Sequence, residues 1–541
     1  MTGKLIALGV ALLLTLAAPF VLRPDTGIPA SDSGINTLTV ITPHNESIRH
    51  EFGLAFATHM KLTRNQTVHI DWRTPGSGTA DLERYLQSEY RANFENYWRN
   101  TLGKDWNNAV VGANFDNRRL TIAETSNSDT HEQAAKRAFL KSSVSCGVDV
   151  FFGGGDYPFK RFAEMGYLVD SGIFDRHPEW FSKDIIPAKF SGEIYYDTRK
   201  RWVGASLASF GICYNPLVLQ RLGISKTPSQ WSHLGEPEYF RKIAIADPTK
   251  SGSVTKALEM LIQQYIRNEI NAGIADNTSL SAGWEQGLML IRRIGANARY
   301  FTDSATKIPF DVAQGNAAAG MCIDFFGRTY NEITTQKGHG SRIHYLTPMG
   351  GSSFSVDPIA LLRGAPNPSL AKAFIDFVIS TAGQKIWAYR PGSPGGPAKK
   401  ALRRLPIRKD LYGQKNREHQ SDPEVLPFSE NEGFEYVAEW TGSHFNPLRF
   451  IVRVMCIDTH DELQAAWQAL INSGFPEKAS AAFNQIDPRI TYMECHKGGK
   501  TGKILSGKDS LAKARLAKEL AASFREQYQT VIKLAKSENS Q

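Results

Sequence analysis

Short apolar runs alternate with helical patterns along most of the chain, and polar residues lie at each transition from a run to a helical pattern. Residues 38–41 read as a buried strand, and Ile48, Phe52 and Phe56 then recur at helical spacing. Comparable strand-like runs follow at 68–72, 148–152, 202–206, 210–215, 243–248, 321–323 and 356–362. Strands that alternate with helices are typical of an α/β fold with largely parallel sheets.

Polar loops follow several of these strands, at the points where helices begin. In an α/β sheet this edge gathers loop side chains and free helix N–H groups, so ligands bind there. The simpler explanation for each loop is a capped helix start. The candidate ligand-binding residues in these loops are Thr42, His44, Asn45, Glu46, Ser77, Thr79, Ser251, Gly252 and Ser253.

The loop at Ser251-Gly252-Ser253 is the best candidate for an anion site. Hydroxyl groups and a glycine come together there with the start of a long amphipathic helix, whose N-terminus carries partial positive charge. The loop lacks the spacing of a nucleotide-binding P-loop.

Asp324 and Arg328 flank two phenylalanines at the end of another strand. Arg328 can bind a carboxylate or a phosphate through its planar guanidinium group, and Asp324 can bind sugar hydroxyls. Alternatively, the two side chains form a structural ion pair.

Length and charge limit the alternatives. A chain of 541 residues is too long for one small core and predicts two large lobes or several domains. The net charge of +9 suits an anionic ligand or partner, but it does not by itself indicate nucleic acid binding, which we do not expect.

The N-terminus predicts that the protein works outside the cytoplasm. Lys4 precedes an apolar run and Ala17-Ala18, as in a cleaved signal peptide, so residues 1–22 are a signal peptide or an uncleaved anchor. Of the five cysteines, Cys456 and Cys495 either pair in an oxidising compartment or stay free.

Two regions differ from the rest of the chain in composition and periodicity. Residues 90–145 are polar with poor periodicity and look like an insertion. Residues 399–541 follow a Pro/Gly linker and end in a basic helix with an apolar face, which either docks on the protein or lies on a membrane surface.

The order of several motifs resembles one family. The motifs are the strand and helix at 38–56, Val148 to Phe152, Tyr214-Asn215-Pro216, Ala246-Asp247-Pro248 with Ser251 to Ser253, and the turn and helix at 364–377. Together they resemble the extracellular solute-binding proteins of ABC importers, in the branch of ferric-iron, thiamine, sugar-phosphate and phosphonate binders.

This resemblance implies a two-lobe α/β fold, the type II periplasmic binding protein fold, with a hinge. It implies lobe 1 at 36–205, lobe 2 at 206–345, a return to lobe 1 at 346–398 and an extension at 399–541. The ligand would contact Asn45, Ser77 and Thr79 from one lobe, and Ser251, Ser253, Asp324 and Arg328 from the other. A permease in the inner membrane would receive the solute, and no cofactor is expected.

The resemblance also bears on the cargo. Ferric-binding relatives carry two adjacent tyrosines where this chain has Phe325-Phe326, and their histidine corresponds to Ile48, four residues after His44. The anion contact at Ser251 to Ser253 is kept. We therefore expect a phosphorylated or carboxylated organic solute, with iron, bare or chelated, as the alternative cargo.

Two other classes compete with a binding protein. A hydrolase would need an acid–base pair such as His44 with Glu46, but the sequence has no GxSxG or HExxH motif. A membrane-tethered sensor domain would keep its leader. We expect a binding protein and no enzyme activity.

Overall fold

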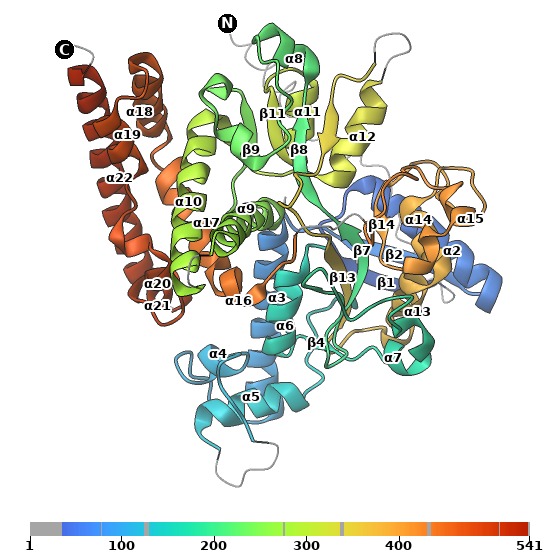
Figure 1. Cartoon of the computed structure of the whole chain (residues 1–541). Helices are drawn as coiled ribbons and strands as arrows, with labels where there is room; N and C mark the ends of the chain where they lie inside the picture. Colours follow the sequence, from blue (N-terminus) through green and yellow to red (C-terminus); the bar gives the residue numbers. More distant parts are fainter. Residues whose placement is uncertain are drawn as a thin grey trace, which may run out of the picture.

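The structure is a computed structural model that describes residues 35–76, 78–123, 129–273, 276–335, 340–429, 434–507 and 509–538 (Figure 1). The predicted leader at 1–22 and the candidate Ser77 lie outside these residues. None of the described helices is both long and apolar enough to cross a membrane.

The first lobe is built on a sheet of order β14-β7-β13-β3-β1-β2, in which β4 also pairs with β13. β1, β2 and β3 are parallel, and β13 returns antiparallel between β3 and β7. Leu38, Val40 and Val150 are fully buried, as the apolar runs predicted. The strands are β1 (Ile35–Ile41), β2 (Thr67–Arg73), β3 (Val150–Phe152), β4 (Leu168–Val169), β7 (Val203–Ala208), β13 (Ser355–Leu362) and β14 (Leu405–Pro406).

The second lobe is built on a sheet of order β10-β9-β11-β8-β12, which lies above the first in Figure 1. β9, β10 and β11 are parallel, whereas β8 and β12 run antiparallel to their neighbours. Its strands are β8 (Phe210–Tyr214), β9 (Ile243–Ala246), β10 (Ala298–Thr302), β11 (Ala319–Ile323) and β12 (His344–Leu346). These two sheets confirm the two-lobe α/β fold.

Helices cover both sheets. Beside the first lie α2 (Glu46–Arg64), α3 (Thr79–Asn96), α6 (Asp156–Met165), α7 (Ile173–Arg176), α13 (Pro368–Ile379) and α14 (Thr381–Ala388). Beside the second lie α8 (Pro216–Arg221), α9 (Gly252–Asn271), α10 (Asp276–Asn297), α11 (Lys307–Ala313) and α12 (Asp324–Thr334).

Helices α4 (Val111–Asn114) and α5 (His131–Lys141) project from the bottom of the molecule (Figure 1). The C-terminal part of the chain is helical and lies largely along α9 and α10. It contains α15 (Gln414–Arg417), α16 (Ala438–Thr441), α17 (Phe445–Val452), α18 (His460–Ser473), α19 (Glu477–Asn484), α20 (Tyr492–Cys495), α21 (Lys500–Ser506) and α22 (Ser510–Glu538).

The terminal helix docks on the protein. α22 packs along α18 and α19, and Leu520, Phe524 and Val531 on its apolar face are fully buried. A membrane-surface role for this face is therefore wrong, because the face is already covered. Cys456 and Cys495 are free, buried thiols.

Candidate functional site between the two lobes

A cavity of about 140 Å³ lies between the lobes. The first lobe supplies the loops after β1 and β3 and the strand β13, and the second supplies the start of α9 and the loop after β10. Both lobes therefore contribute polar groups to one hollow, as a solute-binding cleft requires.

A buried charge cluster forms the first-lobe wall. The Asp357 carboxylate on β13 lies 2.8 Å from a guanidinium nitrogen of Arg404 and 3.2 Å from His44 Nε2. It also accepts hydrogen bonds from the backbone N–H groups of Gly154 and Gly155. One carboxylate thus holds three separate segments in place.

The pKa directions fix the charges of this cluster. Burial alone would raise the pKa of Asp357, but the attraction of Arg404 and the hydrogen bond from His44 lower it well below its usual range. Burial lowers the pKa of His44, and Asp357 offsets this effect only in part. Asp357 is therefore charged and His44 neutral at pH 7.

Two nitrogen atoms of the wall have no partner within the described protein. His44 Nδ1 and Arg404 Nε are buried and have no hydrogen-bond partner within the described chain. Because Nε2 of the neutral His44 ring donates to the acceptor Asp357, Nδ1 is an acceptor. The wall thus offers an acceptor suited to a hydroxyl group and a cationic donor suited to an anion.

The second-lobe wall is the start of α9. The Ser251 side chain caps the helix by accepting a hydrogen bond from the backbone N–H of Val254 at 3.3 Å. Gly252 and Ser253 line the cavity in the first turn, where helix N–H groups remain free. This wall can hold a negative group through hydroxyl and backbone N–H donors.

The C-terminal extension steadies this wall. The Arg449 guanidinium on α17 donates to the backbone carbonyls of Pro248 at 2.7 Å and Thr249 at 2.6 Å, just before the cap. On the other side, Phe445 stacks on Tyr157 of the first lobe, with ring centroids 4.5 Å apart. The extension therefore contacts both lobes beside the cleft.

The lobes nearly touch at the mouth of the cavity. A Cβ atom placed on Gly78 would lie 2.7 Å from the backbone carbonyl oxygen of Lys250. Glycine is thus required at position 78 for this approach.

The structure brings together part of the predicted site. His44, Asn45, Thr79, Ser251, Gly252 and Ser253 all line the cavity. Thr42 is buried beneath them and accepts a hydrogen bond from the His44 backbone N–H at 3.1 Å. Glu46 is exposed in the first turn of α2 and is not part of the lining.

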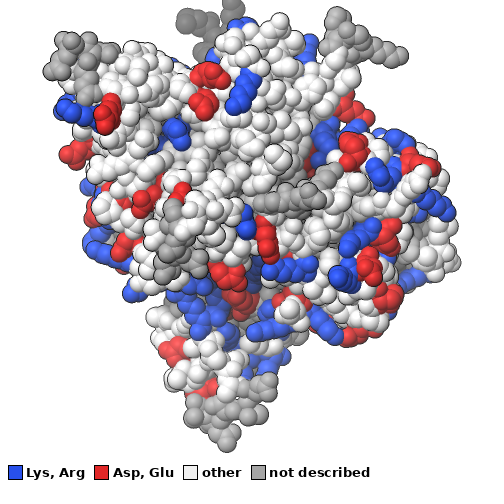
Figure 2. Space-filling view, in the orientation of Figure 1, with Lys and Arg blue, Asp and Glu red and all other residues white. Residues whose placement is uncertain are grey.

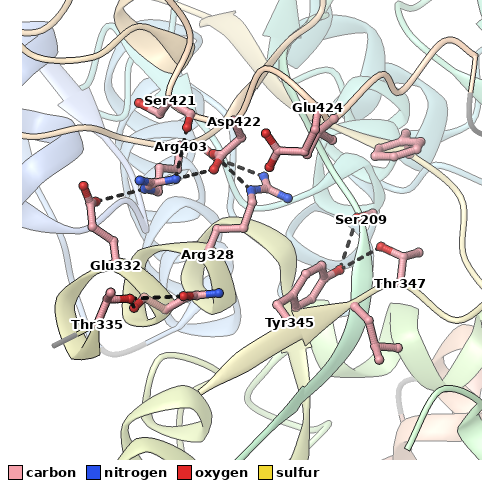
Figure 3. Close-up of a pocket in the computed structure, with 14 residues that line it drawn as sticks. Ser209, Arg328, Glu332, Thr335, Tyr345, Thr347, Arg403, Ser421, Asp422 and Glu424 are labelled. Atoms are coloured by element: carbon pink, nitrogen blue, oxygen red, sulfur yellow. Dashed lines mark hydrogen bonds and ion pairs between the residues drawn. The ribbon is translucent and has the colours of Figure 1, made fainter. Parts of the chain in front are cut away.

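Asp324 and Arg328 lie elsewhere. Asp324 is fully buried, and its carboxylate lies 2.8 Å from the Arg328 guanidinium. Arg328 lines a different hollow of about 800 Å³, where it and Arg403 both contact Asp422 (Figure 3). The ion-pair alternative accounts for this geometry.

Asp357 and Arg404 are functional candidates that the sequence alone did not indicate. Arg404 lies beyond the Pro/Gly linker and contacts the ring of Phe325 at 4.4 Å. A sequence signal existed for Asp357, because an aspartate inside an apolar strand must find a partner when buried.

Comparison with known proteins finds a family similarity in the middle of the chain. Residues 148–411 match the family described as bacterial extracellular solute-binding protein. This segment, slightly less than half of the chain, is similar to that family. The matched segment includes β13 with Asp357, the start of α9 and Arg404, but not α2 or the C-terminal helices.

The relatives are distant. An uncharacterised protein of Haemophilus influenzae is 26% identical over 247 residues, which are 45% of this chain and 62% of the relative. The phosphoglycerate transport regulatory protein PgtC of Salmonella typhimurium is 22% identical over 205 residues, 38% of this chain and 45% of that protein. The chain thus spans about half the length of the curated relatives it matches.

A putrescine/agmatine-binding protein of Pseudomonas aeruginosa is 23% identical over 222 residues, 39% of this chain and 57% of the relative. Among solved structures, the periplasmic binding protein AfuA of Actinobacillus pleuropneumoniae with bound fructose-6-phosphate is 16% identical. The TM-score is 0.45, and the match covers 80% of this chain and 97% of the AfuA chain.

Proposed function

We propose that the protein is the solute-binding component of an ABC importer, and that it captures a small phosphorylated or carboxylated solute between its lobes for delivery to a membrane permease. The observation that carries this proposal is the capped start of α9 at Ser251, Gly252 and Ser253, which faces the Arg404 side of the cavity. Free helix N–H groups and a guanidinium on opposite walls favour a negative group between them.

The cavity does not favour the alternative cargo, iron. Its described lining contains no tyrosine, and Phe325 and Phe326 occupy the place where ferric-binding relatives supply phenolate oxygens. Within the described residues, no group of three His, Cys, Asp or Glu side chains is arranged to hold a metal ion. An anion therefore fits the cavity better than a trivalent cation.

An organic cation such as putrescine fits poorly for a related reason. Asp357 is already engaged by Arg404, His44 and two backbone N–H groups, and Asp303 pairs with Lys307 at 2.9 Å. A diamine would have to displace one of these partners.

The test is the ligand profile of the purified protein. We expect 3-phosphoglycerate or fructose 6-phosphate to raise the melting temperature and to bind in calorimetry, whereas putrescine and ferric citrate do neither. Native and then denaturing mass spectrometry of protein from its own compartment would show a small organic mass. Stoichiometric iron in that sample would overturn the proposal.

A variant locates the ligand. Ser253→Asp places a carboxylate at the second residue of α9, where it repels an anion and should abolish phosphate-ester binding. The matched control is Ser369→Asp, because Ser369 is the exposed second residue of α13 and does not line the cavity. Equal affinity in both variants would remove α9 from the site.

We further propose that the protein works outside the cytoplasmic membrane, with its leader either removed or kept as a tether. N-terminal sequencing of the mature protein distinguishes the two. Steady turnover of a phosphate ester by the purified protein would instead indicate a hydrolase.

A further inference from the structure

A second, much larger hollow lies between the projecting helices α4 and α5 and the C-terminal extension. It has a volume of about 1890 Å³, and its floor is α6 with Tyr157 and Arg161. One wall contains residues 112–122, and the other contains residues between 436 and 513. In Figure 2, Lys and Arg side chains gather at this place, just above the lower projection. We call this hollow the basic groove.

The excess positive charge of the whole protein is concentrated in the basic groove. Its lining contains thirteen Lys or Arg residues and four Asp or Glu residues, a difference of nine. The whole chain has 63 Lys or Arg and 54 Asp or Glu, which also differ by nine. All other residues together therefore carry no net formal charge. Arg161, Arg201 and Lys256 of the lining pair with Glu83, Asp197 and Glu193, which lie outside it, so the groove keeps a smaller positive excess.

Some of these cations have structural partners. Lys136 donates to the carbonyls of Asn117 and Leu120, and Arg161 pairs with Glu83 at 2.7 Å. By contrast, four exposed cations have side chains with neither a carboxylate nor a hydrogen-bond partner within the described chain: Arg119, Arg199, Lys497 and Lys503. These four are available to an external anion.

The shape of the groove excludes several anionic partners. Pockets for small molecules have volumes of about 300–1,000 Å³, so this hollow exceeds what one small solute fills. A flat membrane surface cannot contact α6 at the bottom of the groove, because the two walls rise on either side of it. Single-stranded nucleic acid is held by stacking on free aromatic rings. Here Tyr157 and Phe445 stack on each other, and Lys256 covers the ring of Tyr436 at 3.3 Å.

We infer that the basic groove is a docking site for an extended acidic segment of a partner polypeptide. Carboxylates along such a segment would pair with Arg119 and Arg199 from the first lobe and with Lys497 and Lys503 from the extension. Most of both walls lies outside the segment that matches the solute-binding family, so this site goes beyond the proposed function. Electrostatic pairing of this kind accelerates association and depends strongly on salt.

The experiment measures binding of a fluorescent polyglutamate peptide by anisotropy. We expect binding to the full chain that weakens as the ionic strength rises from about 0.01 M to about 0.15 M. The triple variant Arg119→Gln, Lys497→Gln and Lys503→Gln should weaken binding at least tenfold. The control variant Lys61→Gln, Lys226→Gln and Lys415→Gln removes the same charge from exposed sites outside the groove and should bind as the unmodified chain does.

Equal weakening in both triple variants would overturn the inference, because net charge alone would then explain binding. Tighter binding of vesicles with anionic lipid or of single-stranded DNA than of the peptide would overturn it as well. Phosphate-ester binding measured on the same variants separates this site from the cleft. We expect both triple variants to bind the phosphate ester as the unmodified chain does. If the chain binds no phosphate ester at all, the proposed function fails, but the peptide result still stands.

Discussion

The inter-lobe cavity and the basic groove both attract anions, but they are built in opposite ways. In the cavity, the charged groups Asp357 and Arg404 are buried and paired, and little space remains around them. In the groove, Lys497 and Lys503 are exposed and without carboxylate partners in the described chain, around a hollow more than ten times larger.

This difference indicates two kinds of recognition. Buried, oriented donors such as Arg404 Nε discriminate between ligands, because an unsuitable ligand leaves them without a partner. Exposed lysines act at a distance and tolerate many sequences of the same charge. The first arrangement suits a defined small solute, and the second suits a flexible acidic chain.

The largest effect is expected at the wall of the cavity. Asp357→Asn removes the charge that Arg404 needs and disturbs the contacts to His44, Gly154 and Gly155. Breaking a buried ion pair costs about 3–5 kcal/mol, which denaturant unfolding would measure. The control is Asp71→Asn, which breaks the exposed pair with Arg73 and should cost less than about 1 kcal/mol. Equal losses would show that the cluster does not hold the wall.

The second prediction concerns the stability of the protein in acid, which depends on a buried histidine beside the groove. His444 is buried next to the groove residues Ser443 and Phe445, and burial lowers its pKa to about 4. The unfolded chain, with a histidine pKa of about 6.5, then binds the proton first. Stability is therefore lost as the pH falls from about 6.5 to about 4, by up to about 3 kcal/mol.

Unfolding at a series of pH values tests this sign. His444→Gln should flatten the acid limb of the curve. The control is His131→Gln, which changes an exposed side chain at the start of α5 and should leave the limb in place. If the His444→Gln variant still loses the same stability in acid, groups other than His444 cause that loss.

The third prediction separates both hollows from the Asp324–Arg328 ion pair. Asp324→Asn weakens the contact with Arg328, but Arg328 keeps Asp422 at 3.2 Å. We expect a loss of about 1–3 kcal/mol in stability with unchanged phosphate-ester and polyglutamate binding. A large loss of phosphate-ester affinity at unchanged stability would instead place Asp324 in the ligand site.

The sequence predicted the parts of the site that depend on one strand and the helix after it. His44, Asn45 and Ser251 to Ser253 were found because the carboxyl ends of parallel strands meet at one edge of a sheet. The Asp324–Arg328 pair was also foreseen as an alternative, since residues four apart share a helix face.

The remaining parts depend on contacts between distant segments. Asp357 lies on the return strand, and Arg404 reaches it from beyond a linker, so no local pattern joins them. The basic groove was missed for the same reason: its cations come from residues 91 to 513, and only the fold brings them to one hollow.

The smallest effect is expected at the mouth of the cavity. Gly78 has extended backbone angles that alanine also adopts, so Gly78→Ala acts only through its Cβ contact with the Lys250 carbonyl. The lobes must move apart to relieve this contact, and phosphate-ester affinity should fall about tenfold, or about 1.4 kcal/mol.

Spin labels at Lys61→Cys and Lys226→Cys, one on each lobe, should report a longer distance between the lobes in Gly78→Ala. The control Gly413→Ala, with no atom near its added Cβ, should leave this distance unchanged. Because the basic groove does not involve Gly78, polyglutamate binding should stay the same; a parallel loss would mean that the two hollows are coupled through the position of the lobes.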